Sequence, residues 1–254
     1  MYFIGNSNPP VSKPQRIVSL VPSQTELLFD LGLEAETIGI TKFCIHPESW
    51  FRSKQRIGGT KTIDIEKIKA LSPDLIIANK EENVQEQVEA LQDIAPVWVS
   101  DIHTFEDAMQ MIRTVGELTF TSKKAVAIAS QIEADFKRLE ADLSHPKALY
   151  LIWKSPWMTV GKDTFISDLM KRAGLKNAYD DALRYPEITI ADMQVRQPDL
   201  ILLSSEPFPF KQQHIAELQS ALPDAKVMLV DGEMFSWYGS RLLHSAAYLN
   251  QLQF

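Results

Sequence analysis

Short apolar runs alternate with helix-like segments at both ends of the chain. In the first hundred residues, runs rich in Val, Ile and Leu predict buried strands, and the 3–4 spacing of apolar positions between them predicts helices. Strands are expected at 16–21, 38–40, 74–78 and 97–99, and helices from Ser23 to about Gly32, at 64–71 and at 83–92. Ser23 and Glu26 form the S-x-x-E pattern of a capping box, which predicts the start of the first helix. Strands that alternate with helices are typical of a parallel sheet covered on both faces.

The middle of the chain has a different pattern. From residue 104 to about 143 there is no proline and no strand-like run, and apolar residues recur every three or four positions. This spacing predicts one helix bent near 119–122, or two helices in succession. Forty helical residues would span roughly 60 Å, which is long enough to bridge two lobes.

The last hundred residues repeat the first pattern. Strands are expected at 148–153, 200–202 and 227–231, and a helix at 164–174; residues 197–202 repeat 72–77, and 227–231 repeat 97–101. We therefore predict an α/β fold of two Rossmann-like lobes with parallel sheets, residues 1–103 and 146–254, joined by a helical segment at 104–145. Ligands of open parallel sheets bind outside the carboxyl ends of the strands, so a ligand cleft is expected between the lobes.

Composition and charge narrow the class of protein. The chain has 254 residues, of which 45% are hydrophobic, so it has ample material for a core. A formal charge of −7 argues against a nucleic-acid partner. The apolar runs are too short to span a membrane. A single cysteine, Cys44, permits no internal disulfide, and the first residues carry no pattern of a secretory signal.

Sequence motifs for catalysis are weak, so we expect that the protein is not an enzyme and has no catalytic cofactor. The first strand is followed by Pro22 and Ser23 rather than by the glycines of a dinucleotide site, and no carboxylate pair stands out for acid–base work. The C-x-H pair Cys44 and His46 matches half of a metal site, and a cysteine with a histidine is also the composition of a nucleophilic pair. They leave open one alternative, a metal-dependent enzyme or metal chaperone; the simpler interpretation is a buried thiol and a turn histidine.

Aromatic and cationic residues gather where the predicted strands end. Aromatic faces give large rigid contact areas, and a few polar groups orient a ligand. This pattern favours a large, flat or amphipathic ligand. The candidate contacts are Lys42, Phe43, His46, Trp50, Thr60, Lys61 and Lys80 in the first lobe, and Trp153, Lys154, Trp157, Tyr185, Phe208, Phe210, Phe235, Trp237 and Tyr238 in the second.

Several segments together resemble a known family. Residues 16–27 (RIVSLVPSQTEL), 57–59 (IGG) and 65–76 (IEKIKALSPDLI) are similar to cobalamin-binding proteins, which belong to the substrate-binding proteins of ABC importers for cobalamin, ferric siderophores and haem. The likeness extends from about residue 16 to 250. It implies two lobes joined by a rigid helix, a bound metal chelate, a monomer without catalytic activity, and delivery to an ABC permease dimer. It also implies a periplasmic or other extracytoplasmic location. Because the first residues carry no signal pattern, the alternative is a cytoplasmic carrier of a corrinoid or haem that works without a permease.

The resemblance also assigns roles to single residues. It places permease-docking acids at Glu66 and, one residue away from the matching position, at Asp192. Thr60 and Asn79 stand where the cobalamin receptor has ligand-facing tryptophans, while Tyr185 keeps an aromatic side chain. Lys42, Lys61, Lys80 and Arg241 would add positive charge to the mouth of the cleft. That charge would suit an anionic chelate, such as haem or a ferric siderophore, at least as well as cobalamin.

Overall fold

The computed structural model describes residues 1–4, 9–140 and 144–252. The chain divides into two compact units, and each contains one six-stranded sheet. Unit 1 comprises residues 1–102, 106–131 and 238–241, and unit 2 comprises 103–105, 132–237 and 242–254. The chain therefore passes between the units more than once. Among the described residues, no helix has the length and apolar character that a membrane span requires.

The sheet of unit 1 has the order β1-β6-β5-β2-β3-β4. All pairs are parallel except that of β1 with β6, so the sheet is mixed rather than wholly parallel. The expected strands are confirmed as the interior of this sheet. Its strands are β1 (Tyr2–Phe3), β2 (Ile17–Ser19), β3 (Thr37–Ile40), β4 (Gln55–Arg56), β5 (Leu75–Asn79) and β6 (Val97–Ser100). Every residue of β2, β5 and β6 is buried, as expected for strands covered on both faces.

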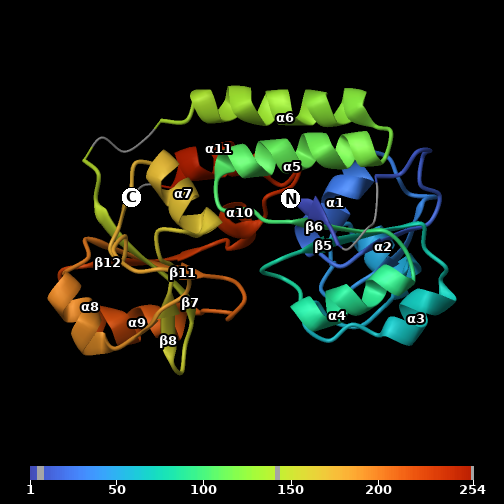
Figure 1. Cartoon of the computed structure of the whole chain (residues 1–254). Coiled ribbons are helices and arrows are strands. Elements are labelled where there is room, and N and C mark those ends of the chain that lie inside the picture. The colour runs from blue at the N-terminus through green and yellow to red at the C-terminus, as the bar shows by residue number, and fades with distance from the viewer. Residues whose placement is uncertain (5–8, 141–143, 253–254) are drawn as a thin grey trace. The chain divides into compact units, whose positions relative to one another are not determined.

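The helices of unit 1 are mostly short and lie on both faces of its sheet. Figure 1 shows α1 on one side and α3 and α4 on the other. Their bounds are α1 (Pro22–Asp30), α2 (Glu48–Ser53), α3 (Ile65–Ala70), α4 (Gln85–Glu89) and a 3₁₀ turn at Ala90–Asp93. At the start of α3 the Asp64 carboxylate accepts a hydrogen bond from the Lys67 amide at 3.1 Å, and this cap fixes where the helix begins.

The expected capping box at Ser23 and Glu26 is wrong. The N-cap of helix α1 is Val21, two residues before Ser23, with Pro22 in the first turn, and no side chain caps the helix. Proline is favoured at this position because its missing N–H would have no partner there. Ser23 is already inside the helix, and Glu26 instead pairs with Arg241.

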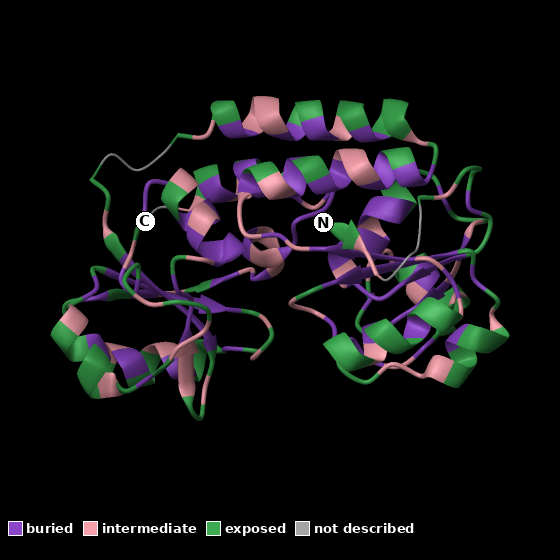
Figure 2. Cartoon of the chain, in the orientation of Figure 1, coloured by how far each residue is buried: buried purple, intermediate pink, exposed green. Residues whose placement is uncertain are grey.

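The central segment forms two helices in succession, α5 (Phe105–Leu118) and α6 (Ser122–Lys137). Each helix is buried along one face and exposed along the other (Figure 2), as the 3–4 spacing predicts. Gly116 allows their close approach, because an added Cβ would lie 2.3 Å from the Ala125 Cβ. The boundary between the two units falls within α6, between Gln131 and Ile132.

The sheet of unit 2 has the order β10-β8-β7-β11-β12, and β9 pairs with β7. Strands β7, β11 and β12 are parallel, while β8 is antiparallel to both β7 and β10. The hairpin of β7 and β8 was not expected from the sequence. The strands are β7 (Lys147–Trp153), β8 (Trp157–Thr159), β9 (Lys176–Asn177), β10 (Glu187–Ile188), β11 (Leu200–Ser204) and β12 (Lys226–Val230).

Helices cover both faces of this second sheet as well (Figure 1). Ile201 and Leu203 of β11 share a core cluster with Met193 of α8 and Leu218 of α9. Because side chains alternate along a strand, Leu200 and Leu202 point to the opposite face, where they are also buried. The helices are α7 (Phe165–Arg172), α8 (Ile190–Arg196), α9 (Gln212–Ala221), α10 (Glu233–Ser236) and α11 (Leu242–Gln251).

Candidate ligand-binding site

The loops that follow the parallel strands of unit 1 are held by buried amide side chains; we call these loops the carboxyl edge of unit 1. Asn79 ends β5 and is 1% exposed. Its Oδ1 accepts the amides of Glu81 and Glu82 at 2.8 and 3.0 Å, and its Nδ2 donates to the carbonyl and hydroxyl oxygens of Ser100. Asn83 in turn donates to the Leu20 and Thr60 carbonyls. Asn79, a candidate ligand contact, therefore organises the loops from within.

The loop after β3 holds a buried thiol and an exposed aromatic ring. Cys44 is fully buried, and its Sγ lies 3.1 and 3.2 Å from the hydroxyls of Thr25 and Thr41. Burial raises the pKa of the thiol, so Cys44 is a poor nucleophile and metal ligand. Phe43 next to it is 50% exposed, with the Lys42 ammonium 5.1 Å from its ring centroid.

Two further candidates of unit 1 differ in exposure. His46 is half-buried and precedes the cis peptide bond to Pro47. Trp50 is fully buried, with its ring edge-on to Phe29 at 5.4 Å between centroids. Among the described residues, no group of three His, Cys, Asp or Glu side chains is arranged to hold a metal ion.

Three of the four candidate cations of unit 1 have hydrogen-bond or ion-pair partners within the protein. The Lys80 ammonium lies 2.7 Å from the Asp101 carboxylate, and Lys61 donates to the Glu81 carbonyl. Arg241 and Glu26 form a bidentate pair with N···O distances of 2.7 and 3.0 Å, and both side chains are largely buried. Burial raises the pKa of Glu26, and the Arg241 guanidinium partly opposes that rise.

Unit 2 presents an aromatic cluster at the carboxyl ends of β7 and β11. Trp153 packs edge-on to Phe208 at 5.7 Å, and Trp157 stacks on Phe210 at 6.0 Å between centroids. Phe208 and Phe210 are themselves 4.7 Å apart. Trp153 is 39% exposed and Trp157 is half-buried, so part of this aromatic surface is accessible. We call Trp153, Trp157, Phe208 and Phe210 the aromatic cluster.

Three other aromatic candidates are buried. Phe235 has no exposed surface and packs against Tyr150 at 5.2 Å between centroids. Trp237 is 7% exposed, and its Nε1 donates to the Glu206 carboxylate at 2.9 Å. Tyr238 is also buried. Their roles in the structure as described are packing and hydrogen bonding, and ligand contact by them remains a prediction.

The remaining second-lobe candidate, Tyr185, is half-buried, and the Arg184 guanidinium lies 5.6 Å from its ring centroid. In unit 1, Thr60 is buried and its carbonyl accepts from Asn83. Among the aromatic candidates, accessible rings are therefore found at Phe43 and in the aromatic cluster, whereas Trp50 lies within α2 and Trp237 follows α10.

The two candidate docking acids lie in different settings. Glu66 is exposed in the first turn of α3. Asp192 belongs to a capping box at the start of α8, where its Oδ2 accepts from the amide and hydroxyl of Thr189 at 2.8 and 2.7 Å. These hydrogen bonds hold the pKa of Asp192 below its usual range. Its carboxylate is therefore already used to begin the helix.

Glu206 is the functional candidate that the sequence analysis missed. It lies in the loop after β11, two residues beyond Ser204, is half-buried, and accepts from the Ser236 hydroxyl at 2.7 Å as well as from Trp237. Burial raises its pKa, and the carboxylates of Glu233 and Asp231 raise it further. Its place in the loop after a predicted parallel strand is the signal that the sequence offers.

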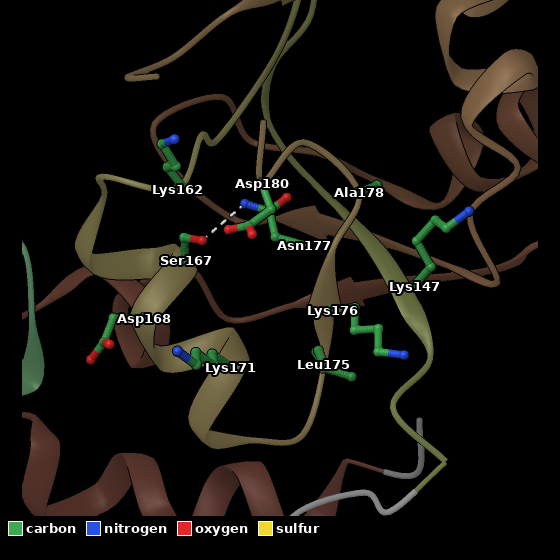
Figure 3. A pocket seen from close by; sticks show the side chains of 10 residues that line it. All are labelled: Lys147, Lys162, Ser167, Asp168, Lys171, Leu175, Lys176, Asn177, Ala178 and Asp180. Carbon is green, nitrogen blue, oxygen red and sulfur yellow. Dashed lines mark hydrogen bonds between the residues drawn. The ribbon is translucent and has the colours of Figure 1, made fainter. Parts of the chain in front are cut away.

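A pocket of about 500 Å³ lies elsewhere on unit 2 (Figure 3). None of its lining residues is a candidate from the sequence: Lys147, Lys162, Ser167, Asp168, Lys171, Leu175, Lys176, Asn177, Ala178 and Asp180. Lys147 begins β7, so this end of the pocket is at the amino end of the strand, whereas the aromatic cluster is at the carboxyl end. In Figure 3 the ammonium groups of Lys162, Lys171 and Lys176 point in different directions and do not converge on one point.

Comparison with known proteins defines the class. Residues 17–231 match the model of the periplasmic binding protein family, and the chain belongs to this family. It is 26% identical over 241 residues to a vitamin B12-binding protein of Pectobacterium carotovorum, covering 92% of this chain and 86% of the relative. It is 25% identical over 252 residues to the ABC transporter substrate-binding lipoprotein YvrC of Bacillus subtilis, covering 93% and 79%.

Solved structures share the two-lobe α/β fold. The periplasmic vitamin B12-binding protein BtuF of Vibrio cholerae superposes with a TM-score of 0.80 at 22% identity, over 93% of this chain and 95% of that one. The periplasmic haem-binding protein HutB of Vibrio cholerae gives a TM-score of 0.79 at 19% identity, over 94% and 99%. The fold expected from the sequence is confirmed.

Proposed function

We propose that this protein captures a metal chelate outside the cytoplasm and delivers it to an ABC importer. The chelate would be a corrinoid, a ferric siderophore or haem. Family membership over residues 17–231 carries the proposal. It is supported by relatives named as a vitamin B12-binding protein and an ABC transporter substrate-binding lipoprotein, and by similar structures named for vitamin B12, haem and a siderophore.

The aromatic cluster is the part of the structure best suited to a large planar or amphipathic chelate. Trp153 and Trp157 come from the β7–β8 hairpin, and Phe208 and Phe210 come from the loop after β11. The rings contact one another at 4.7–6.0 Å between centroids, so each ring is held in place by its neighbours before a ligand arrives. A preorganised aromatic surface binds with little loss of side-chain entropy.

In unit 1 the ligand contact would come from Phe43, whose ring is half exposed on the loop after β3. The buried amides of Asn79 and Asn83 hold the neighbouring loops by hydrogen bonds of 2.8–3.2 Å. A fixed backbone behind an exposed ring is the arrangement expected of a binding surface that changes little when the ligand enters.

Delivery would use the exposed carboxylate of Glu66 to contact a cationic side chain of the permease. Glu66→Lys should lower ligand-stimulated ATP hydrolysis by the importer while leaving chelate affinity unchanged. Because the Asp192 carboxylate already caps α8, Asp192→Asn should act chiefly through the stability of that helix. A loss of chelate affinity in the Glu66→Lys variant would contradict the docking role.

A fluorescence titration tests the binding function. Cyanocobalamin, haemin and ferric siderophores are added to the purified protein, and quenching of Trp153 and Trp157 reports occupancy. Saturable quenching by one chelate at micromolar concentration is the expected result. Trp153→Ala should weaken that binding, whereas Phe120→Ala, which removes another exposed ring on the turn between α5 and α6, should not. Equal weakening by both variants would show that the aromatic cluster is not the site.

A further inference from the structure

The loops that follow the parallel strands of unit 2 form its carboxyl edge, and the loop after β11 lies in the middle of that edge. Strand β11 is flanked by β7 and by β12. The Phe208 amide donates to the Ile152 carbonyl of β7 at 3.3 Å, and the Glu206 carboxylate accepts from Ser236 and Trp237, which follow β12. Glu206 and Phe208 are two residues apart, a span of at most about 7 Å between Cα atoms. One large ligand can therefore contact both this carboxylate and the aromatic cluster.

The side chain of Glu206 is fixed by its surroundings. Ser204 Oγ donates to the Glu206 carbonyl at 2.6 Å and so holds the backbone. The backbone of Gly232 lies against the side chain, because a Cβ added to Gly232 would be 2.7 Å from the Glu206 Cγ. One carboxylate oxygen, Oε1, accepts from Ser236 Oγ at 2.7 Å and from Trp237 Nε1 at 2.9 Å. These contacts hold the carboxylate in one orientation before a ligand arrives.

The second carboxylate oxygen, Oε2, is available to a ligand. Among the described residues none donates a hydrogen bond to Oε2, and the atom keeps contact with solvent. An ionised carboxylate oxygen can only accept, so its partner must be an N–H, an O–H or an ammonium group. Hydrogen bonds to an ionised acceptor are about twice as strong as those between neutral groups. A fixed, accessible and charged acceptor thus stands beside the accessible rings.

We infer that Glu206 is a further ligand-binding residue, whose Oε2 accepts a hydrogen bond from the rim of a chelate that packs on the aromatic cluster. The inference rests on the proposed function, which places the chelate on this cluster. It also defines the chemistry of the ligand: a flat or apolar body with an N–H, O–H or ammonium group at its edge. A chelate whose rim carries only acceptors would displace water from Oε2 without replacing its hydrogen bond, and this loss costs affinity.

Glu206→Gln tests the inference and keeps the internal contacts. Trp237 Nε1 is a donor only, so the amide oxygen of the glutamine takes the place of Oε1 and its NH₂ group takes the place of Oε2. The substitution therefore converts the accessible acceptor into a donor at the same point. Asp224→Asn is the matched control, because it makes the same change from carboxylate to amide on an exposed residue that precedes β12, at the opposite edge of the sheet.

Two kinds of chelate give different expectations in titrations of these variants. Cyanocobalamin has amide NH₂ groups on its rim and ferrioxamine B has an ammonium group, whereas the polar rim groups of haemin are carboxylates. The titrations are made at about pH 8, far above the ordinary pKa of a glutamate carboxyl. Glu206→Gln should weaken binding of a donor-bearing probe by about tenfold or more and leave haemin binding unchanged or stronger. Asp224→Asn should change neither affinity, and circular dichroism checks that both variants are folded.

The outcomes separate the inference from the proposed function. A role of Glu206 in structure alone would weaken all probes equally, so equal weakening overturns the inference, as does an unchanged affinity of Glu206→Gln for a donor-bearing probe. A protein that binds haemin or ferric enterobactin but neither donor-bearing probe also overturns it. In each of these cases the proposed function stands. Saturable binding of none of the four chelates overturns the proposed function, and the inference with it.

Discussion

Glu206→Gln and Glu206→Ala should differ sharply in their effect on stability. In the native protein one carboxylate oxygen, Oε1, accepts from the Ser236 hydroxyl at 2.7 Å and from the Trp237 indole at 2.9 Å. The amide oxygen introduced by E206Q can accept both hydrogen bonds. E206A removes both and leaves the N–H of a side chain that is only 7% exposed without this acceptor.

The magnitude follows from those contacts. Two hydrogen bonds at about 1 kcal/mol each, with about 1 kcal/mol for the buried donor left behind, give a loss of about 3 kcal/mol for E206A. At a urea m-value of about 3 kcal/mol/M, that loss lowers the unfolding midpoint by about 1 M. E206Q keeps the two bonds and removes a carboxylate whose charged form is disfavoured by burial and by Glu233 and Asp231. It should be at least as stable as the unmodified protein at pH 7.5.

The pH dependence has a definite sign. Because the pKa of Glu206 is raised in the folded protein, its contribution to stability is fully present below the pKa of the unfolded chain and is lost as pH rises through the folded pKa. The difference between E206Q and the unmodified protein should therefore be largest near neutral pH and should diminish as Glu206 becomes protonated.

Urea unfolding followed by tryptophan fluorescence and by circular dichroism measures these differences. Both probes are needed because the chain has two compact units and they need not unfold together. An E206Q variant destabilised as much as E206A would refute the reasoning, since it would mean that the negative charge, rather than the acceptor oxygen, stabilises the loop.

Three further predictions test the interior of unit 1. Asn79→Ala should lower the free energy of unfolding by about 2–4 kcal/mol in urea, because it removes the acceptor of two amides and the donor to Ser100; a loss below 1 kcal/mol would contradict this. Arg241→Met should lower the free energy of unfolding by about 3–5 kcal/mol, because it removes the guanidinium that pairs with Glu26. Adding Glu26→Gln to this variant should recover most of the lost stability. Additive losses in this double-mutant cycle would argue against the pair. Cys44 should react with a thiol reagent only on unfolding, and Cys44→Ser should leave metal content unchanged; rapid reaction of the native thiol would revive a chemical role.

The sequence predicted the layered fold well because its signals are local. Buried runs such as Leu75–Asn79, and the 3–4 spacing from Phe105 to Lys137, determine strands and helices directly. The antiparallel strands β1, β8 and β10 were missed because they have only two or three residues and take their pairing from distant strands. The start of α1 was misplaced because Pro22 determines it, although Ser23 matches a capping pattern.

The sequence could name candidate side chains but not which of them are accessible. Strand-end placement identified Trp153, Trp157 and Phe43 as rings with accessible surface. It could not distinguish them from Trp50 and Phe235, whose burial depends on packing between elements far apart in sequence. The pairing of charged side chains was harder to predict than the accessibility of the rings. Arg241 is 215 residues from Glu26, and no local pattern indicates that the two are paired.

Isothermal titration calorimetry of the purified protein with cyanocobalamin, ferrioxamine B, ferric enterobactin and haemin tests the central claim most directly. Capture of a chelate requires saturable binding of at least one probe, at one molecule per chain and with micromolar or tighter affinity. Absence of measurable heat and of any shift in unfolding temperature with all four would contradict the assignment as a chelate-binding protein.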